Sequence, residues 1–363
     1  MGGIKKHKRK EPLIRIAKRE GLSKPKTVAL KVCATVLALV AGGLFIAAQG
    51  HNPFSVYFFM VKGALGTKMS FQETVKVAIP LLISSLGITL AFRMRFWNIG
   101  AEGQIIVGAI AASYFALYKN TMPHAVLMSV MALAAIVAGG IWAGIPAFFK
   151  SRFGTNETLL TLMFNYIAQY MIQYLREGPW KDPNALGFLQ IARFSDNARL
   201  GSVLGIQAGW IVALLLTVAV YIYINFTKSG YELRVVGESE NTARYAGMNV
   251  KRIMMRTMFI SGAVCGLAGM LQASGTDRTL TDTVAGGVGF TAIIVAWLAN
   301  LSAPMILVVT ALFSILEKGI SFIQSRFMIS SAAAAVLQGI ILFFVLGFEF
   351  FTRYRLVLRR EAR

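Results

Sequence analysis

The sequence predicts an all-α integral membrane protein, and two features of its composition lead to this class. Of its 363 residues, 56% are hydrophobic, and the mean hydropathy is +0.62, well above the values of soluble domains of this length. The apolar residues also gather in runs that can cross a hydrocarbon core of about 30 Å, which takes roughly 20 helical residues. We therefore expect helices that span a membrane and contact its lipid.

About ten such runs are candidate transmembrane helices. They are residues 28–48, 72–92, 99–117, 124–149, 158–175, 209–226, 257–273, 288–301, 304–321 and 332–351. The run 288–301 is short for a span, which is typical of a broken or re-entrant segment. Nine and eleven spans stay open as alternatives.

The basic residues predict the orientation, because loops rich in Lys and Arg stay in the cytoplasm. With the N-terminus inside, 26 of the 37 Lys and Arg residues fall on cytoplasmic segments, so we expect both termini inside. The expected organisation is a basic tail (1–27), a membrane domain (28–351) and a second basic tail (352–363). The net charge of +21 does not indicate nucleic acid binding, since the charges stand in blocks between apolar runs.

The sequence lacks the residue patterns of an enzyme or a metal site. Its two cysteines lie within apolar runs, and its three histidines form no HExxH motif or cluster. No GxSxG motif occurs. We expect no catalytic residue and no bound metal.

Two loops are longer than simple connections. The outer loop, residues 176–208, is rich in Pro, Gly and mixed charge and is suited to irregular structure or docking. In the inner loop, 227–256, we expect Gly230 and Gly237 to break the chain between two short helical pieces. Asn241 or Thr242 would cap the second piece, and Gly247 would end it. Its exposed residues could insert into a partner, or the loop could simply be solvated.

This inner loop resembles the coupling segment of permease subunits of ATP-binding-cassette (ABC) importers. The stretches FWNIGAEGQIIVGA, FGTNETLLTLMFNYIAQY, YLREGPWKDP, GYELRVVGESENTARYAGMNVKR, SGAVCGLAGM and GGVGFTAIIVAWLANLSAP follow the order and spacing of the nucleoside-type branch. That family also serves simple sugars and branched-chain amino acids. The resemblance covers residues 71 to about 347 and leaves the first seventy residues unassigned.

The resemblance implies a multi-pass permease domain in a bacterial cytoplasmic membrane, working with three kinds of partner. These are an ATP-binding subunit, a second similar permease that is usually a different chain, and an extracellular substrate-binding lipoprotein. The chain has no GxxxxGK[ST] motif, so we expect it to hold no cofactor and the partner to use ATP and Mg.

The resemblance also implies which residues contact the ATP-binding subunit. The expected coupling residues are Gly237, Glu238, Arg244, Tyr245, Ala246, Gly247 and Met248. The chain departs from the family pattern at Ser239, Glu240 and Asn241, where a proline is common, which leaves the start of the coupling helix open.

A weak internal repeat indicates where a substrate would pass. Gly100 and Gly103 recur 186 positions later as Gly286 and Gly289, each pair before an apolar run, as in transporters with two related halves and broken helices. Aromatic rings there could stack on a solute ring, and amides could bind its polar edge. The candidate path residues are Phe96, Trp97, Asn98, Gly100, Glu102, Gln104, Asn156, Glu157, Asn165, Gly289 and Phe290.

Each polar set on this path has a structural alternative. Phe96 and Trp97 could be interfacial anchors, with Asn98 capping the next helix. Asn156, Glu157 and Asn165 form a set at the inner end of the fifth run, where Asn156 could be a cap rather than part of a gate.

Three other patterns concern packing. Gly140 with Gly144, and Gly262 with Gly266, form GxxxG pairs that predict close helix contacts. The adjacent Glu317 and Lys318 are expected to form an ion pair near a helix end.

The expected function is import of nucleosides or a related small polar solute, with sugars and vitamins such as riboflavin also possible. A stand-alone secondary transporter is the alternative, although it would need an intramembrane carboxylate relay that the chain scarcely has. A polytopic membrane enzyme is the third class, and the missing catalytic motifs disfavour it.

Overall fold

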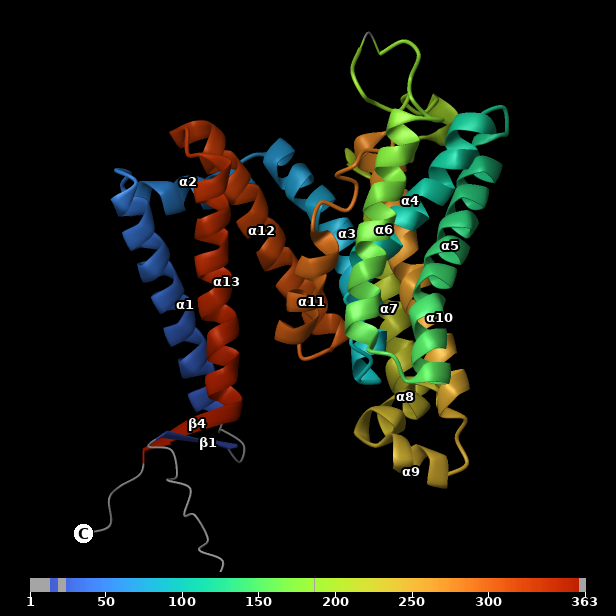
Figure 1. Ribbon diagram of the computed structural model, residues 1–363. Coiled ribbons are helices and arrows are strands. Elements are labelled where there is room, and N and C mark those ends of the chain that lie inside the picture. Colours follow the sequence, from blue (N-terminus) through green and yellow to red (C-terminus); the bar gives the residue numbers. More distant parts are fainter. Residues whose placement is uncertain (1–13, 19–23, 186, 359–363) are drawn as a thin grey trace, which may run out of the picture. The chain divides into compact units, whose positions relative to one another are not determined.

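The computed structural model describes residues 14–18, 24–185 and 187–358, and these are mostly helical (Figure 1). The chain divides into two compact units. The small unit comprises residues 1–59 and 323–363, and the large unit residues 60–322.

In the small unit, the two ends of the chain come together. Helix α1 (Lys24–Ala48) packs along α13 (Ser331–Arg353), and strand β1 (Ile14–Lys18) pairs antiparallel with β4 (Tyr354–Leu358). These strands fall within the predicted basic tails. Residues 1–13, 19–23 and 359–363 of those tails lie outside the described residues.

Helix α2 (Pro53–Leu65) was not expected from the sequence. It follows α1 after a bend of 112° and holds only 13 residues, too few to cross a membrane alone. The Tyr57 hydroxyl of α2 donates a hydrogen bond to the Leu39 carbonyl of α1 at 2.7 Å, which fixes the bend.

The large unit is a helical bundle. Its helices are α3 (Lys68–Arg93), α4 (Ala101–Tyr118), α5 (His124–Phe153), α6 (Glu157–Glu177), α7 (Gly209–Phe226), α8 (Lys228–Glu238), α9 (Glu240–Tyr245), α10 (Val250–Leu271) and α11 (Val288–Leu298), with most of α12 (Ala303–Phe327). Shorter elements are the 3₁₀ turn η1 (Asp196–Ala198), the antiparallel pair β2 (Ser202–Val203) and β3 (Ile206–Gln207), and the π-helix η2 (Gln272–Asp277) that extends α10.

Each of the ten predicted apolar runs contains a helix. Within the described residues, six helices are long and apolar enough to cross a membrane, or seven if the bent pair α1–α2 counts as one span. The run 288–301, predicted to be broken or re-entrant, forms the 11-residue helix α11.

Small residues let α10 approach its neighbours closely at the centre of the bundle. A Cβ on Gly266 would lie 2.3 Å from the carbonyl oxygen of Ala135 in α5. A Cβ on Gly262 would lie 2.3 Å from the carbonyl oxygen of Gly139, also in α5. This confirms the predicted Gly262/Gly266 contact. The predicted role of Gly144 is wrong, since a Cβ there would meet nothing within 4 Å.

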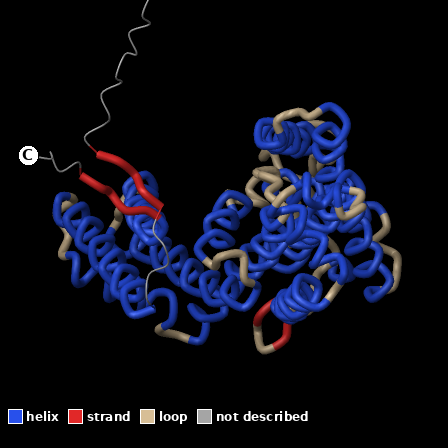
Figure 2. Tube along the Cα trace, turned by 90° about the horizontal axis from the view of Figure 1, so that it is seen from below, coloured by secondary structure: helices blue, strands red, loops and turns tan. Residues whose placement is uncertain are grey.

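The two ends of this bundle differ in structure. Figure 1 shows α8 and α9 at one end and the α6–α7 connection at the other. We call them the α9 end and the hairpin end, after the β2–β3 hairpin in that connection. The hairpin is the smaller of the two strand pairs in Figure 2.

Candidate functional site

The segment that joins α3 to α4 enters the interior of the bundle, and contacts with α6 show how far. At the α9 end, Glu157 begins α6. The Thr161 hydroxyl, four residues further, accepts the N–H of Ile99 at 3.2 Å. After four more residues, the Asn165 amide accepts the N–H of Gly103 at 2.8 Å and donates to the Ile99 carbonyl at 2.9 Å. Since an α-helix rises 1.5 Å per residue, the contacts of the non-helical Ile99 lie about 6 to 12 Å along α6 from its start.

A second non-helical segment reaches the same depth from the hairpin end. The Asp282 carbonyl accepts from Gln169 of α6 at 3.0 Å, and its carboxylate pairs with Arg176 at 2.6 Å. From there the chain descends to α11, which begins at Val288 beside α4. Two interruptions of helical structure, far apart in the sequence, therefore meet within the bundle.

Glu102 joins these two segments. Its carboxylate accepts the N–H of Gly287 at 2.7 Å and the N–H of Gly289 at 2.8 Å. A Cβ on Gly289 would lie 2.3 Å from the Glu102 nitrogen, so only glycine allows α11 to begin this close to α4. A carboxylate at a helix N-terminus satisfies otherwise unpaired N–H groups and is stabilised by the helix dipole.

Asn98 and Gln104 bind each other in the interior. The Gln104 amide donates to Asn98 Oδ1 at 3.1 Å, and Asn98 Nδ2 lies 3.4 Å from both Gln104 Oε1 and Ser261 Oγ. The two side chains are 0% and 1% exposed. Asn98 Oδ1 also accepts the N–H of Gly100, which is itself the N-cap of α4. Asn98 is therefore not the N-cap of α4, as the alternative interpretation expected. Its side chain closes a turn just before the helix, and the amides of Asn98 and Gln104 face each other.

Aromatic side chains lie at the start of the same turn. Trp97 stacks on Trp297 of α11, with ring centroids 5.6 Å apart, and both rings contact Phe92 of α3. Phe96 is buried, whereas Trp97 is 47% exposed and Phe290 is also exposed. Of the three predicted aromatic residues, two therefore keep a face that a solute, lipid or partner could contact.

The second predicted polar set divides into two places. The Asn156 side chain caps α6 by accepting the Leu159 N–H at 3.1 Å, and Glu157 pairs with Lys150 at 2.8 Å. The grouping of Asn165 with them is wrong, because it lies two helical turns further along α6 and binds the α3–α4 segment instead.

The loop 227–256 folds into α8 and α9 as two helical pieces. The expected breaks at Gly230 and Gly237 are wrong, since both lie within α8. A Cβ on Gly237 would lie 2.0 Å from the Arg93 carbonyl oxygen, so this glycine allows α8 to contact the end of α3. Glu238 ends α8 and is exposed.

Helix α9 is capped by Ser239, whose hydroxyl accepts the Thr242 N–H at 3.2 Å. The expected cap at Asn241 or Thr242 is therefore wrong. The helix begins directly after Ser239, in the stretch where the family pattern commonly has a proline. The helix ends as predicted before Gly247, which has a φ of +76°.

The outer surface of α9 is open. Tyr245 is 93% exposed, Arg244 and Ala246 are exposed beside it, and Met248 is partly exposed. A hollow of about 410 Å³ lies next to these residues, lined by Ala246, Gly247 and Met248 together with residues of α8 and α10. An exposed aromatic ring on a short helix is suited to insertion into a partner.

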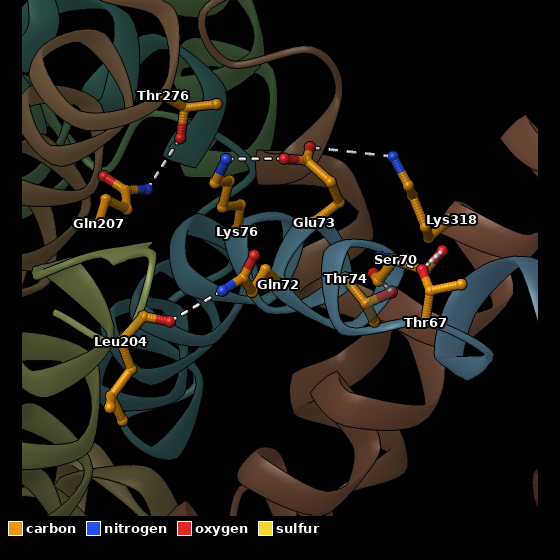
Figure 3. Close-up of polar contacts among 10 residues, drawn as sticks. All are labelled: Thr67, Ser70, Gln72, Glu73, Thr74, Lys76, Leu204, Gln207, Thr276 and Lys318. Atoms are coloured by element: carbon orange, nitrogen blue, oxygen red, sulfur yellow. Dashed lines mark hydrogen bonds and ion pairs between the residues drawn. The ribbon is translucent and has the colours of Figure 1, made fainter. Parts of the chain in front are cut away.

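The expected ion pair between Glu317 and Lys318 is not formed. Adjacent residues of a helix point in different directions, and Lys318 instead approaches Glu73 of α3 at 3.9 Å. Glu73 also pairs with Lys76 at 2.7 Å (Figure 3).

Sequence reasoning missed three residues of this site, Thr161, Ser261 and Trp297. Thr161 is one helical turn from Asn165, a spacing that could have linked them. Ser261 and Trp297 stand in apolar runs, and nothing around them marks a contact with residues 97 and 98.

A bundle of apolar spans with non-helical backbone and polar side chains in its interior defines a multi-pass membrane protein. The chain belongs to the family of permease components of branched-chain amino acid transport systems, whose model matches residues 70–346. It is thus an ABC importer permease, a transport subunit rather than an enzyme, and such a permease works with a separate ATP-binding subunit.

Three relatives illustrate this similarity. The glucose ABC transporter permease protein TsgB13 of Haloferax volcanii is 32% identical, over 92% of this chain and 90% of its own. The guanosine ABC transporter permease protein NupP of Bacillus subtilis is 32% identical, over 86% of this chain and 91% of its own. The nucleoside ABC transporter permease protein NupB of Lactococcus lactis is 28% identical, over 82% of this chain and 85% of its own.

Proposed function

We propose that this chain forms part of the pore of an ATP-driven importer for nucleosides or a related small polar solute, such as a sugar, in a bacterial cytoplasmic membrane. The names of the three relatives support this solute range, since they specify glucose, guanosine and nucleosides. The single observation that carries the transport role is the meeting of two interrupted helical segments at Glu102. Non-helical backbone at membrane depth is tolerated where protein buries it or where it lines a cavity, and transporters place their solute sites there.

The proposed topology has ten spans between residues 28 and 351, with both termini inside. Four further segments supplement the six apolar spans: α1 with α2, α6, α13, and the short α11 together with the non-helical residues 282–287 before it. The α9 end would then be cytoplasmic and the hairpin end extracellular. The basic residues of the inner loop 227–256 support this orientation.

The proposed path runs beside the junction of α4 and α11. Trp97 and Phe290 are its exposed aromatic residues, and Glu102 with Gly289 holds the junction. The buried residues of the same set would support the side of the path formed by Trp97 and Phe290 without contacting the solute. They are Phe96, Asn98, Gly100, Gln104 and Asn165. Asn156 and Glu157 would support it at the α9 end.

The proposed coupling surface consists of exposed or partly exposed residues of α8, α9 and the turn after α9, namely Glu238 and Arg244 to Met248. Gly237 holds α8 against α3. Tyr245 would be its principal contact with the ATP-binding subunit. We further propose that a second, similar permease completes the pore and that an extracellular lipoprotein delivers the solute. This chain would bind no cofactor, while the ATP-binding subunit would use ATP and Mg.

Reconstitution of the complete transporter tests this function. We expect proteoliposomes with all subunits to import radiolabelled guanosine or D-glucose only when ATP is supplied on the coupling side. The purified chain alone should show no ATPase activity. Gradient-driven uptake by the chain alone would instead support a stand-alone secondary transporter.

A further inference from the structure

The hairpin end holds polar atoms that the proposed path does not use. Strand β3 places Gln207 against the π-helix that extends α10, where its amide donates to the Thr276 hydroxyl at 2.8 Å (Figure 3). In that π-helix, the Gln272 amide donates to Asp277 Oδ1 at 3.0 Å. We call Gln207, Gln272, Thr276 and Asp277 the outer polar cluster.

Two amide oxygens in the outer polar cluster have no hydrogen-bond partner. Gln207 is 3% exposed, and its Oε1 is buried and accepts no hydrogen bond among the described residues. The same holds for Gln272 Oε1. A carboxylate can only accept, so the bond to Asp277 requires that the nitrogen of Gln272 points to it and that the oxygen is left over. A buried acceptor without a donor is destabilising.

The Asp277 carboxylate adds further acceptor capacity. Besides Gln272 it receives only a long contact of 3.4 Å from the Thr281 hydroxyl. It forms no ion pair within the described part of the chain. Two carboxylate oxygens offer about four lone-pair positions, and these contacts use about half of them.

The local backbone allows this arrangement to exist. A π-helix widens the turn and is frequent at functional sites. The Gln207 side chain occupies the space beside Gly275, since a Cβ there would lie 1.5 Å from Gln207 Oε1. The cluster reaches the surface through Thr276, which is exposed, and Asp277, which is partly exposed, whereas the two unpaired amide oxygens are buried.

The outer polar cluster contrasts with the interior amides. Asn98 and Gln104 satisfy each other, whereas the cluster presents a partly exposed carboxylate, Asp277, with free acceptor positions. The free positions on the Asp277 carboxylate are all acceptors, so this carboxylate suits a solute that carries several hydrogen-bond donors. Adjacent hydroxyl groups on a sugar ring have this character, and a carboxylate can accept from two of them at once.

We propose that the outer polar cluster binds the hydroxyl groups of a sugar ring as the solute enters the pore. The site would thus take ribose-bearing nucleosides and hexoses alike and would not read the base. This inference rests on the proposed function, since it assumes import of such a solute through this chain.

The test compares solutes with and without the hydroxyl pair in the complete transporter. We would measure kcat/KM for uptake of guanosine and of 2′,3′-dideoxyguanosine; if glucose is the imported probe, D-glucose and 2-deoxy-D-glucose replace them. In Asp277→Asn the preference for the hydroxylated solute should fall about tenfold relative to the unmodified transporter, since hydrogen bonds to a charged group are worth at least that much. The lipoprotein contributes equally to both transporters, so the change in the ratio reports on this chain.

A matched control and a second variant complete the design. Asp196→Asn removes a carboxylate at the same end that is paired with Arg199, and it should leave the ratio unchanged. Gln272→Met removes the amide that donates to Asp277 Oδ1 at nearly constant side-chain volume, so the carboxylate loses the bond that positions it and the ratio should fall. This variant serves if Asp277→Asn fails to assemble, which co-purification of the ATP-binding subunit would reveal. Normal ratios in assembled variants, or no preference in the unmodified transporter, would overturn this inference alone. Failure of the unmodified transporter to import either probe would overturn the proposed function with it.

Discussion

The carboxylate of Glu102 accepts the backbone N–H of Gly289, 187 positions further along the chain, at 2.8 Å. The same carboxylate accepts the Gly287 N–H, so one side chain caps the N-terminus of α11 from the first turn of α4. The internal repeat of glycines in the sequence corresponds here to a direct contact between the two segments.

Replacing Glu102 should disturb this junction more than it disturbs the fold. In Glu102→Ala both N–H groups lose a charged partner, and we expect the free energy of unfolding to fall by about 3 kcal/mol, since hydrogen bonds to charged groups contribute roughly 1.5–3 kcal/mol each. ATP-dependent uptake should fall at least about tenfold. Thermal unfolding of the purified chain and uptake by the complete transporter measure the two effects.

The control for this experiment is Glu177→Ala, which removes an exposed carboxylate at the end of α6. It should change stability by less than about 1 kcal/mol, as expected for a surface ion pair. Normal uptake by a correctly assembled Glu102→Ala transporter would mean that the junction has no part in transport.

The amide pair should act on folding and leave solute affinity unchanged. Gln104→Ala removes the amide that donates to Asn98 Oδ1 in the interior, and we expect about 1–3 kcal/mol of destabilisation. Because Asn98→Ala removes the same Asn98–Gln104 contact, together with those to Gly100 and Ser261, the double variant should lose less than the sum of the two single losses. The KM for uptake should stay constant, since Gln104 is 1% exposed. A changed KM at normal stability would instead place this amide on the path.

The glycines of α10 should tolerate no side chain. Gly266→Ala puts a methyl group 2.3 Å from the Ala135 carbonyl oxygen and must separate α10 from α5, which we expect to destabilise the chain by about 1–3 kcal/mol. Gly144→Ala is the matched control, since it meets open space and alanine favours helix by up to about 1 kcal/mol. Equal melting temperatures for the two variants would argue against close packing at Gly266.

Tyr245 should matter for coupling and not for folding. Its side chain is 93% exposed, so Tyr245→Ala should leave the melting temperature of the chain within about 1 °C. Uptake and co-purification of the ATP-binding subunit should both fall about tenfold or more, as when an aromatic anchor of an interface is removed. Tyr245→Phe keeps the ring and should retain most of the activity. Full uptake by Tyr245→Ala would show that α9 is only a solvated turn.

The sequence determined the class of this protein and where its ten long apolar runs form helices, but it did not reveal α2. Apolar runs of about 20 residues form helices because helical backbone satisfies its own hydrogen bonds, which depends on local chain order alone. Local chain order also predicted Gly247 as a helix end, and of the two alternatives left open for Asn156, a cap or part of a gate, the structure shows the cap. Ordered motifs identified the family.

Only the tertiary structure decided which polar residues meet. That Glu102 caps α11, that Asn98 and Gln104 satisfy each other, and that Gly237 contacts α3 all depend on approaches between segments far apart in the chain. Local spacing could not predict these contacts, so Gly237 was wrongly taken as a break and Lys318 as the partner of Glu317. Once the helices pack, a buried polar group must bond to whatever lies beside it, and the fold alone sets that neighbour.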